Sequence, residues 1–446
     1  MYTQPQIEWS SSIDQLAQDY RTGHAKRVVH GLQKDAIQNA WGARAKVRGW
    51  GVSFELLTGR DGRIYLTMTD RGTTGLTGMA YDDPETIPDN LPVEERLARF
   101  ENMNFSGGNY GPGLYGRGKL LFQAASRIGK IAYDSQTSEE QYRLGGRFQE
   151  GRRLQQFPKV AEGQAARNLL DKYTGGTLHP LNDVGTRITI FDPLDEIVES
   201  IQDGTFISHI EETWWEILYK HRSGIEISVV ADGQTSVAAC PSMFGNLASG
   251  KFADANSFDK EIYTVTVRGV QYRVKRILMA KTDRPIPDAL RGLCVQRKGM
   301  KVGTIDLKDI PADLDEYFFG FIELDKKYEE VLAEAEDLVH YSFGAQFSSY
   351  RELKKSSQLH FDEFKRKLGY DVDPEQTADK KAEEALRAAS DKLNDIFKDL
   401  GILGAGPKRQ KRKILVSVAS VAFPVPGSKR VEIGDTLRNV AFRICS

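Results

Sequence analysis

The stretch GLQKDAIQNAWGAR, residues Gly31–Arg44, decides the fold that we predict for this chain. Its Ala, Gln and Leu content predicts a helix. Asp35, Gln38, Asn39 and Gly42 recur at three- and four-residue spacing, which places them on one helix face. A carboxylate and a carboxamide one turn apart can hold a water and a hydrated metal ion. An ordinary surface helix is the alternative, and the sequence that follows favours the site.

The composition indicates which class of protein this chain belongs to. The chain has 446 residues, 40% hydrophobic and 28% charged, which is typical of a soluble globular protein of about 2–4 domains. Its net charge of −1 excludes long-range attraction of nucleic acid or anionic membrane by the whole chain. Cys240, Cys294 and Cys445 lack CxxC spacing, which favours a reducing compartment without a zinc site. With no membrane-length apolar run and no signal peptide, we expect a cytoplasmic protein and no membrane partner.

A β-hairpin is predicted after the first helix. Apolar residues alternate with polar or small ones over residues 52–56 and again over residues 64–68, on either side of a turn at residues 60–62. The second strand ends at Asp70-Arg71-Gly72-Thr73-Thr74-Gly75-Leu76. This segment places a carboxylate at a strand end, followed by a flexible turn.

A glycine-rich loop follows a long connection. Residues 77–110 read as loop with one short helix near residues 94–100, and a connection of this length is often a functional lid. It closes on Gly107–Lys119, GGNYGPGLYGRGK, which leads into a helix, LLFQAAS. Glycines before a helix N-terminus expose backbone N–H groups toward an anion. A glycine loop without a ligand is the alternative. Further strands are predicted at residues 130–147 and 186–191, and the region between them is predicted to hold a loop at residues 165–180 with a short helical piece.

Four elements in this order resemble the ATP-binding (Bergerat) fold of the GHKL superfamily, which gyrase, large heat-shock chaperones, histidine kinases and mismatch-repair proteins share. They are the helix with an acid four residues before Asn39, the Asp70–Leu76 turn, the Gly113–Lys119 loop, and Gly185-Thr186 before a strand. The resemblance covers about residues 10–195. It implies an α+β protein whose N-terminal domain is a two-layer α/β sandwich that binds ATP and Mg²⁺.

The resemblance also implies a role for each matching residue. Asn39 matches the asparagine that helps to hold Mg²⁺, for which an amide oxygen is a suitable hard ligand. Asp35 matches the glutamate that orients and deprotonates the attacking water. Asp70 matches the aspartate that accepts a hydrogen bond from the adenine amino group. The other matched positions are Gly72 and Gly75 in the turn, Gly113, Gly116 and Gly118 beside the phosphates, Lys119 as a cation near them, and Thr186, which supports Asp70 through a water.

Three departures from the family pattern bear on hydrolysis. Asp35 is one methylene shorter than the usual glutamate, which lengthens the reach to the attacking water. Gly42 stands where the family often has an aspartate, and two residues rather than one separate Gly72 from Gly75. These departures weaken hydrolysis more than binding. They keep open the alternative of a nucleotide-binding scaffold without turnover.

The second half predicts another α+β domain. Residues 201–219 predict a helix with Trp214 and Trp215, a pair found more often in a core or domain interface than in a nucleic-acid stacking platform. Strands are predicted at residues 226–230, 263–267, 270–279 and 293–302, the last interrupted by a basic turn. In gyrase and mismatch-repair proteins, a lysine on such a turn reaches the terminal phosphate. Lys298 resembles that lysine, with Lys301 as its competitor and an exposed basic hairpin as the alternative.

The remaining segments are predominantly helical in pattern. Helices are predicted at residues 325–343, 348–368 and 374–400, and the apolar stripe of the last one favours packing in a bundle or on a protein partner. The basic run Lys408–Lys413 is a candidate for contact with DNA, although a solvated hinge is the commoner role. The predicted domains are residues 1–200 for ATP binding, with a lid at about residues 76–118, residues 201–345 for a transducer-like α+β domain, residues 346–400 for a helical segment, residues 401–413 for a linker, and residues 414–446 for a short β tail.

These features predict an ATP-hydrolysing conformational switch. Mg-ATP would close the lid, Lys298 would sense the terminal phosphate, and the chain would form an ATP-dependent homodimer with residues 1–20 as a strap. A setting in DNA repair, chromosome handling or anti-phage defence is a hypothesis. The alternatives are the non-hydrolysing scaffold and a histidine-kinase-type protein kinase, for which His24 and His30 are the histidines near the first helices.

Overall fold

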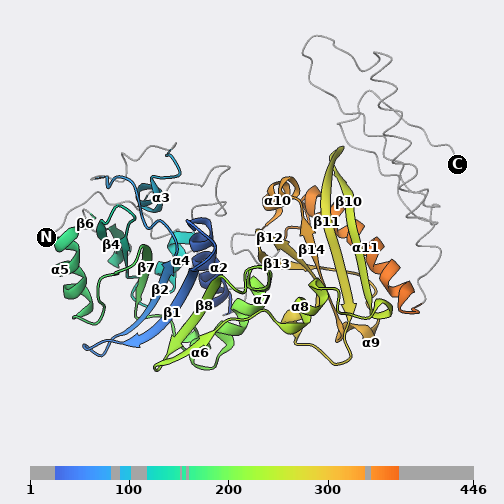
Figure 1. The fold of residues 1–446 in the computed structure, drawn as a ribbon, viewed down its shortest axis with the longest axis horizontal. Helices are drawn as coiled ribbons and strands as arrows, with labels where there is room; N and C mark the ends of the chain where they lie inside the picture. Colours follow the sequence, from blue (N-terminus) through green and yellow to red (C-terminus); the bar gives the residue numbers. More distant parts are fainter. Residues whose placement is uncertain are drawn as a thin grey trace, which may run out of the picture. The chain divides into compact units, whose positions relative to one another are not determined.

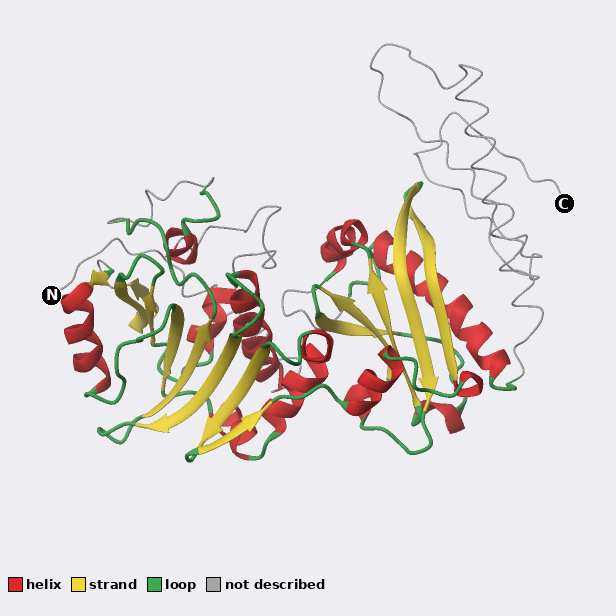
Figure 2. Ribbon diagram, in the orientation of Figure 1, coloured by secondary structure: helices red, strands yellow, loops and turns green. Residues whose placement is uncertain are grey.

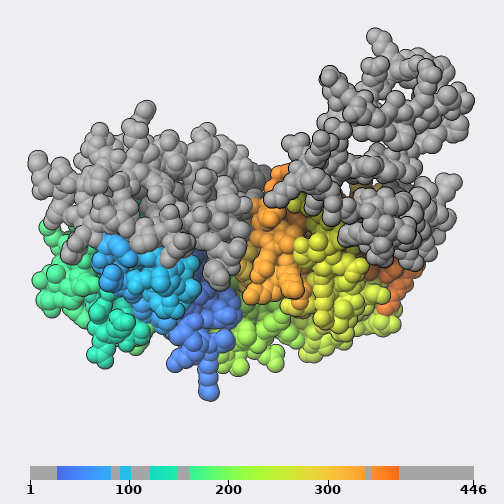
Figure 3. Space-filling model, turned by 90° about the horizontal axis from the view of Figure 1, so that it is seen from above, coloured from blue at the N-terminus to red at the C-terminus, as the bar shows by residue number. Residues whose placement is uncertain are grey.

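The computed structural model describes residues 26–81, 91–101, 118–150, 153–156, 160–336 and 343–370; the other residues are grey in Figure 3. Contacts divide the chain into two compact units, Met1–Thr377 and Ala378–Ser446, and every described residue belongs to the first. The described residues form a mixed α+β fold with two mixed sheets (Figure 2). The predictions for residues 1–20, the glycine-rich loop up to residue 117, the helix at residues 374–400, the basic run and the β tail lie outside the described residues.

The first sheet is nine-stranded and mostly antiparallel (Figure 1). Its strand order is β5-β4-β3-β7-β2-β1-β8-β9, β6 pairs with β4, and the one parallel pair among the described strands of this sheet is β1 with β8. The strands are β1 (Trp50–Thr58), β2 (Ile64–Arg71), β3 (Ile131–Gln136), β4 (Tyr142–Glu150), β5 (Arg153–Gln156), β6 (Ala161–Glu162), β7 (Gly185–Phe191), β8 (Ile225–Ala231) and β9 (Gln234–Val237). The predicted hairpin is confirmed, because β1 and β2 pair antiparallel with Phe54 opposite Met68.

Helices pack on the first sheet through one large apolar core. The helices are α2 (Lys26–Gly42), α3 (Arg96–Glu101), α4 (Gly118–Ala124), α5 (Gly163–Thr174), α6 (Asp195–Gln202) and α7 (Thr205–Lys220). Val52, Phe54 and Met68 point from β1 and β2 into the same core as side chains of α2, α4, α6 and α7. Helix α5 packs on β4 through a separate cluster that includes Leu144 and Leu170.

The second sheet has five strands in the order β10-β11-β14-β12-β13. They are β10 (Ser257–Val267), β11 (Val270–Lys281), β12 (Gly292–Arg297), β13 (Met300–Ile305) and β14 (Phe318–Leu324), and β12 with β14 is the parallel pair among them. The nearby helices are α8 (Ser242–Ala248), α9 (Ala312–Asp315), α10 (Lys326–Leu332) and α11 (Ser348–Lys367), with 3-10 turns η2 (Asp254–Asn256), η3 (Asp288–Leu290) and η4 (Ala333–Ala335). Helix α11 packs on β10, while α8 and α10 pack on β11.

Helix α7 packs in two apolar clusters at once. Trp214 is fully buried in the core that contains α2 and β1. Its neighbour Trp215 is buried in a second cluster, where its ring stacks on Phe244 at 4.6 Å and contacts Phe321 of β14. The expectation that this tryptophan pair is buried is therefore confirmed.

Several predicted elements differ from the structure in extent or type. Residues 165–180 were expected to be a loop with a short helical piece; the helix is present as α5, but it is longer and covers residues 163–174, where Ala166 and Leu170 provide an apolar face. The helix expected at residues 201–219 is confirmed as α7 over residues 205–220, and Gly204, in a left-handed conformation with φ +80°, separates it from α6. Strand β14 was missed, since its near-continuous apolar run FFGFIEL carries no alternation. The helix expected at residues 325–343 ends early: α10 stops at Leu332, and Glu336 forms a β-bridge with Phe343.

Among the described residues, no helix combines the length and apolar character that crossing a membrane requires.

Candidate functional site

Asp70 and Thr186 meet at one end of the first sheet. Because β2 and β7 run antiparallel, the end of β2 lies beside the start of β7. The Thr186 backbone N–H donates to Asp70 Oδ1 at 3.0 Å, and the Thr73 hydroxyl donates to the same oxygen at 2.5 Å. A Cβ on Gly185 would lie 2.2 Å from the Asp70 carbonyl oxygen, so this approach of the two strands requires glycine.

The Asp70 carboxyl keeps one oxygen, Oδ2, that accepts no hydrogen bond from the described residues. Both of its hydrogen bonds from described residues go to Oδ1, and none from these residues reaches Oδ2. Burial of the carboxyl raises the pKa of Asp70 from 3.8 to about 6, although the bonds from Thr73 and Thr186 and the charge of Arg96 lower it. The residue as a whole keeps part of its surface exposed. A carboxylate of this kind is suited to accept a hydrogen bond from a ligand.

Ser135 of β3 completes the strand-end network and was missed from the sequence. Its hydroxyl donates to the Gly185 carbonyl at 2.8 Å and accepts from the Leu76 backbone N–H at 2.8 Å. Its Oγ also lies 3.4 Å from the Thr186 hydroxyl oxygen. Ser135 is fully buried, and it joins the segment after Asp70 to the start of β7. No spacing in the sequence indicates this role, because the contact depends on the pairing of β3 with β7.

The two turn glycines are required by the backbone. Gly72 has φ +70°, and a Cβ there would lie 2.8 Å from Trp50 Cα. Gly75 has φ +69°, and a Cβ there would lie 2.5 Å from the Gln136 carbonyl oxygen. Both positions therefore shape the turn that follows Asp70. The predicted ligand contact of these glycines stays a prediction.

Helix α2 ends at this turn. The Ala45 N–H donates to the Gly72 carbonyl at 2.9 Å, and Arg44 forms a β-bridge with Thr73. Asn39 is exposed one turn after Asp35, which is 8% exposed. The helix therefore presents the Asn39 amide to solvent, while the Asp35 carboxylate lies within the packed side of α2.

The loop residues are only partly described. Gly118 is the first residue of α4, which packs against α2. Lys119 follows it in the same helix, and its side chain lies outside the described residues, as do Gly113 and Gly116. Their predicted contacts with phosphates stay predictions.

Lys298 lies on the second sheet, in the two-residue turn between β12 and β13. Its φ is +52°, and its backbone N–H donates to Glu329 Oε1 at 3.2 Å. Burial lowers the pKa of the Lys298 ammonium, and the charge of Arg297 lowers it further. Its competitor Lys301 donates from Nζ to the Ala289 carbonyl at 2.5 Å. The predicted approach of Lys298 to a nucleotide at Asp70 stays a prediction.

No model of a known protein family and no curated protein matches this chain. The geometry of the residues must therefore carry the functional assignment.

Arg96 is a second residue that the sequence did not single out. It begins α3, which is tied to the segment after Asp70 by the bond from Leu97 N–H to the Thr77 carbonyl at 2.9 Å. The Arg96 charge lowers the pKa of Asp70, although less than the hydrogen bonds from Thr73 and Thr186 do. Burial lowers the pKa of Arg96 itself, as does the like charge of Arg99. Arg96 lay in the helix predicted near residues 94–100, where nothing in the pattern distinguished it from other surface charges.

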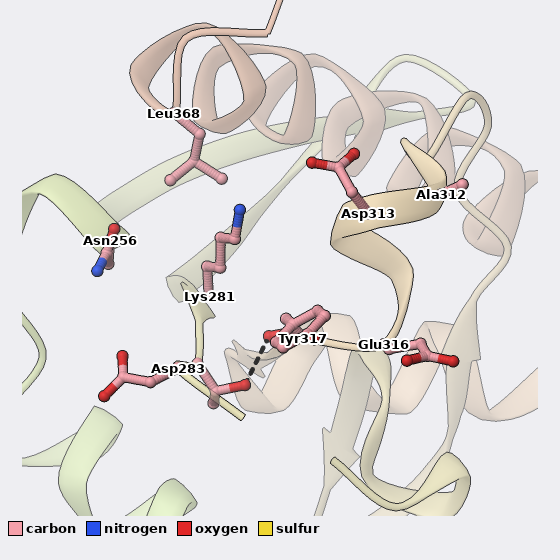
Figure 4. Close-up of a pocket in the computed structure, with 9 residues that line it drawn as sticks. Asn256, Lys281, Asp283, Ala312, Asp313, Glu316, Tyr317 and Leu368 are labelled. Carbon is pink, nitrogen blue, oxygen red and sulfur yellow. Dashed lines mark hydrogen bonds between the residues drawn. The ribbon is translucent and has the colours of Figure 1, made fainter. Parts of the chain in front are cut away.

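A groove of about 650 Å³ lies elsewhere, beside the second sheet (Figure 4). It is lined by Asn256, Lys281, Thr282, Asp283, Ala312, Asp313, Glu316, Tyr317 and Leu368. The Tyr370 hydroxyl donates to Asp313 Oδ2 at 2.7 Å and accepts from Lys281 Nζ at 3.2 Å. None of these residues belongs to the strands that carry Asp70 and Thr186. Among the described residues, no three His, Cys, Asp or Glu side chains cluster as metal ligands.

Proposed function

We propose that this protein binds Mg-ATP at the strand end that carries Asp70 and uses it as a conformational switch, in the manner of the GHKL superfamily. The observation that carries the proposal is the Asp70 carboxyl, which is buried, held by Thr73 and Thr186, and left with Oδ2 as an acceptor. In the family that the sequence resembles, the aspartate that matches Asp70 binds the adenine amino group. The two-layer sandwich of that superfamily is part of the same proposal.

The chemistry of Asp70 favours adenine over guanine. Adenine carries an amino group at the position where guanine carries a carbonyl oxygen. The amino group would donate to Asp70 Oδ2, whereas the guanine oxygen would face a carboxylate with no proton between them. Unpaired buried charges of this kind cost ~1.5–3 kcal/mol, which predicts ~10–150-fold preference for ATP over GTP.

The residues of α2 fit a magnesium ion held mainly by phosphates. Mg²⁺ keeps several waters and takes few protein ligands when it is bound with a nucleotide. The Asn39 amide oxygen would be one such ligand, because this residue is exposed. The bound ion would neutralise phosphate charge. Asp35 would orient the attacking water, and Lys298 would meet the terminal phosphate.

The test is calorimetric binding of Mg-ATP to the wild type and to Asp70→Asn, with phosphate release measured in parallel. The carboxamide of the variant would direct a donor or a weaker acceptor toward the adenine amino group, so affinity is expected to fall at least tenfold. Asp61→Asn is the matched control, because Asp61 accepts hydrogen bonds at the opposite end of β2. If the wild type shows no binding, the proposal is wrong.

A scaffold that binds ATP without hydrolysing it is the second candidate. Asp35 favours it, because this carboxylate is both short and 8% exposed, which limits its access to an attacking water. Binding lost in Asp70→Asn, without phosphate release by the wild type, would select the scaffold. A phosphorylated protein product would select the kinase instead.

The partners stay predictions. The proposed ATP-dependent homodimer involves residues 1–20, the proposed DNA contact involves Lys408–Lys413, and the proposed protein partner involves the helix at residues 374–400. All three segments lie outside the described residues. Binding of duplex DNA at low salt, where electrostatic attraction is strongest, tests the second of these proposals.

A further inference from the structure

The Lys298 turn holds an unfavourable backbone conformation. Lys298 and Gly299 have φ of +52° and +82°, the pattern of a type I′ hairpin turn. Such turns favour Asn, Asp or Gly at the first position, because other residues pay about 1 kcal/mol or more for a left-handed conformation. A lysine keeps this conformation only where its surroundings enforce it.

A buried ion pair stands directly before the turn. Arg297, the last residue of β12, pairs through Nε with Glu336 Oε2. The two residues are 2% and 4% exposed. Buried pairs of this kind add little net stability compared with apolar side chains of similar size, and in some proteins they specify the relative positions of the segments that carry them. Here they join the end of β12 to the segment after α10.

The turn is enclosed by two helices. On one side, Glu329 of α10 accepts the Lys298 N–H at 3.2 Å. Burial raises the pKa of Glu329, while this hydrogen bond lowers it. On the other side, a Cβ on Gly299 would lie 2.5 Å from Ile217 Cγ2 of α7. The backbone of the turn therefore has little freedom to move, although Lys298 itself is exposed.

We propose that Arg297 is a positioning residue, whose ion pair with Glu336 holds the Lys298 turn, together with Glu329, in the geometry that Lys298 needs to meet the terminal phosphate. This inference rests on the proposed function. Positioning of a charge matters most in the transition state, so its loss lowers kcat for phosphate release and leaves ATP affinity nearly unchanged.

The experiment uses the double variant Arg297→Met/Glu336→Met in the full chain. Removing one partner alone would leave a buried charge unpaired and could unfold the protein, whereas paired apolar replacements preserve many folds. We expect kcat for phosphate release to fall about tenfold, with the Kd for Mg-ATP within about twofold of the wild type, as for lost transition-state positioning. The matched control is Asp362→Leu/Lys365→Met, which removes a buried 3.2 Å ion pair of α11 and should leave kcat unchanged.

A Lys298→Ala background separates positioning from general damage. If Arg297 acts through Lys298, the effects of the two changes are not additive. The kcat of the triple variant should then lie within about twofold of the kcat of Lys298→Ala alone. A full additional tenfold loss would show that Arg297 acts elsewhere and would overturn the inference. So would an unchanged kcat in the double variant.

Hydrogen exchange at the Lys298 amide provides a readout without ATP. The double variant should exchange this amide at least about tenfold faster, because its bond to Glu329 is no longer held. Glu329→Gln keeps an acceptor oxygen, so the Lys298 amide should exchange at the wild-type rate. Glu329→Ala removes the acceptor, so the same amide should exchange faster. Unchanged exchange in the double variant overturns the positioning of the turn, whereas absence of ATP binding by the wild type overturns the proposed function.

Discussion

The Asp70 carboxyl would make the proposed ATP binding depend on pH. Its pKa is about 6 in the folded protein, because the group is buried. Adenine would donate to the ionised form, so protonation of Asp70 competes with binding. We predict a nearly constant Kd for Mg-ATP between pH 7 and 8 and a Kd about tenfold higher at pH 5. Calorimetry over this range measures it, and the Kd of Asp70→Asn should change much less because the variant does not titrate.

The same residue lowers stability near neutral pH. The folded pKa of about 6 lies above the ordinary value of 3.8, so the folded state binds this proton more tightly. Ionisation of Asp70 therefore costs almost nothing below about pH 3, costs progressively more up to pH 6, and costs up to ~3 kcal/mol above it, less in proportion to its exposure. Asp70→Asn should raise the free energy of unfolding at pH 8 by ~1–2 kcal/mol and much less at pH 4.5. An equal gain at both pH values in urea unfolding would contradict this assignment.

At the scale of elements, local periodicity decides what the sequence can predict. Helix α2, the β1–β2 hairpin and the β10–β11 hairpin were predictable because their side chains repeat with the period of one helix or strand. Strand β14 was not, because its near-continuous apolar run lacks the alternation that marks a half-buried strand. The break at Gly204 depends on one glycine in a left-handed conformation, which interrupts an otherwise helical pattern. In the site, Asp70 and Thr186 were matched only through the family resemblance. Ser135 and Arg96 belong to other segments that pack beside Asp70, and no sequence spacing encodes that packing.

The contact between β2 and β7 can be tested by adding one methyl group. In Gly185→Ala, the Cβ would lie 2.2 Å from a backbone oxygen of Asp70, so the strands must separate. We expect a loss of ~2–3 kcal/mol in the free energy of unfolding and a weaker Thr186–Asp70 bond. Gly224→Ala is the matched control, since its Cβ would meet Arg48 Cα at an ordinary 3.5 Å, and it should cost less than about 1 kcal/mol. Urea unfolding compares the two, and equal losses would show that the strand contact is not tight.

At the scale of the whole described molecule, the two sheets share their apolar interior. One continuous core contains side chains of α2 and β1 together with side chains of β11, β13 and α11. Helix α7 contributes Trp214 to this core and Trp215 to the neighbouring cluster, and Lys220 at its end pairs with Glu323 of β14 at 3.3 Å. Movement of α7 would therefore act directly on the Lys298 turn, because Gly299 of that turn packs against Ile217 of α7.

Because α7 packs in both apolar clusters, it limits where the chain can be divided into fragments for expression. Phe206, Ile210 and Trp214 follow residue 200, yet they fill the interior beneath β1. A fragment that stops at residue 200 would lack these three side chains and would leave Phe54, which contacts Phe206 at 5.1 Å between ring centroids, open to water. Such a fragment should form inclusion bodies, whereas one that extends past Val237 would keep these side chains together with β8 and β9, which complete the first sheet beside β1.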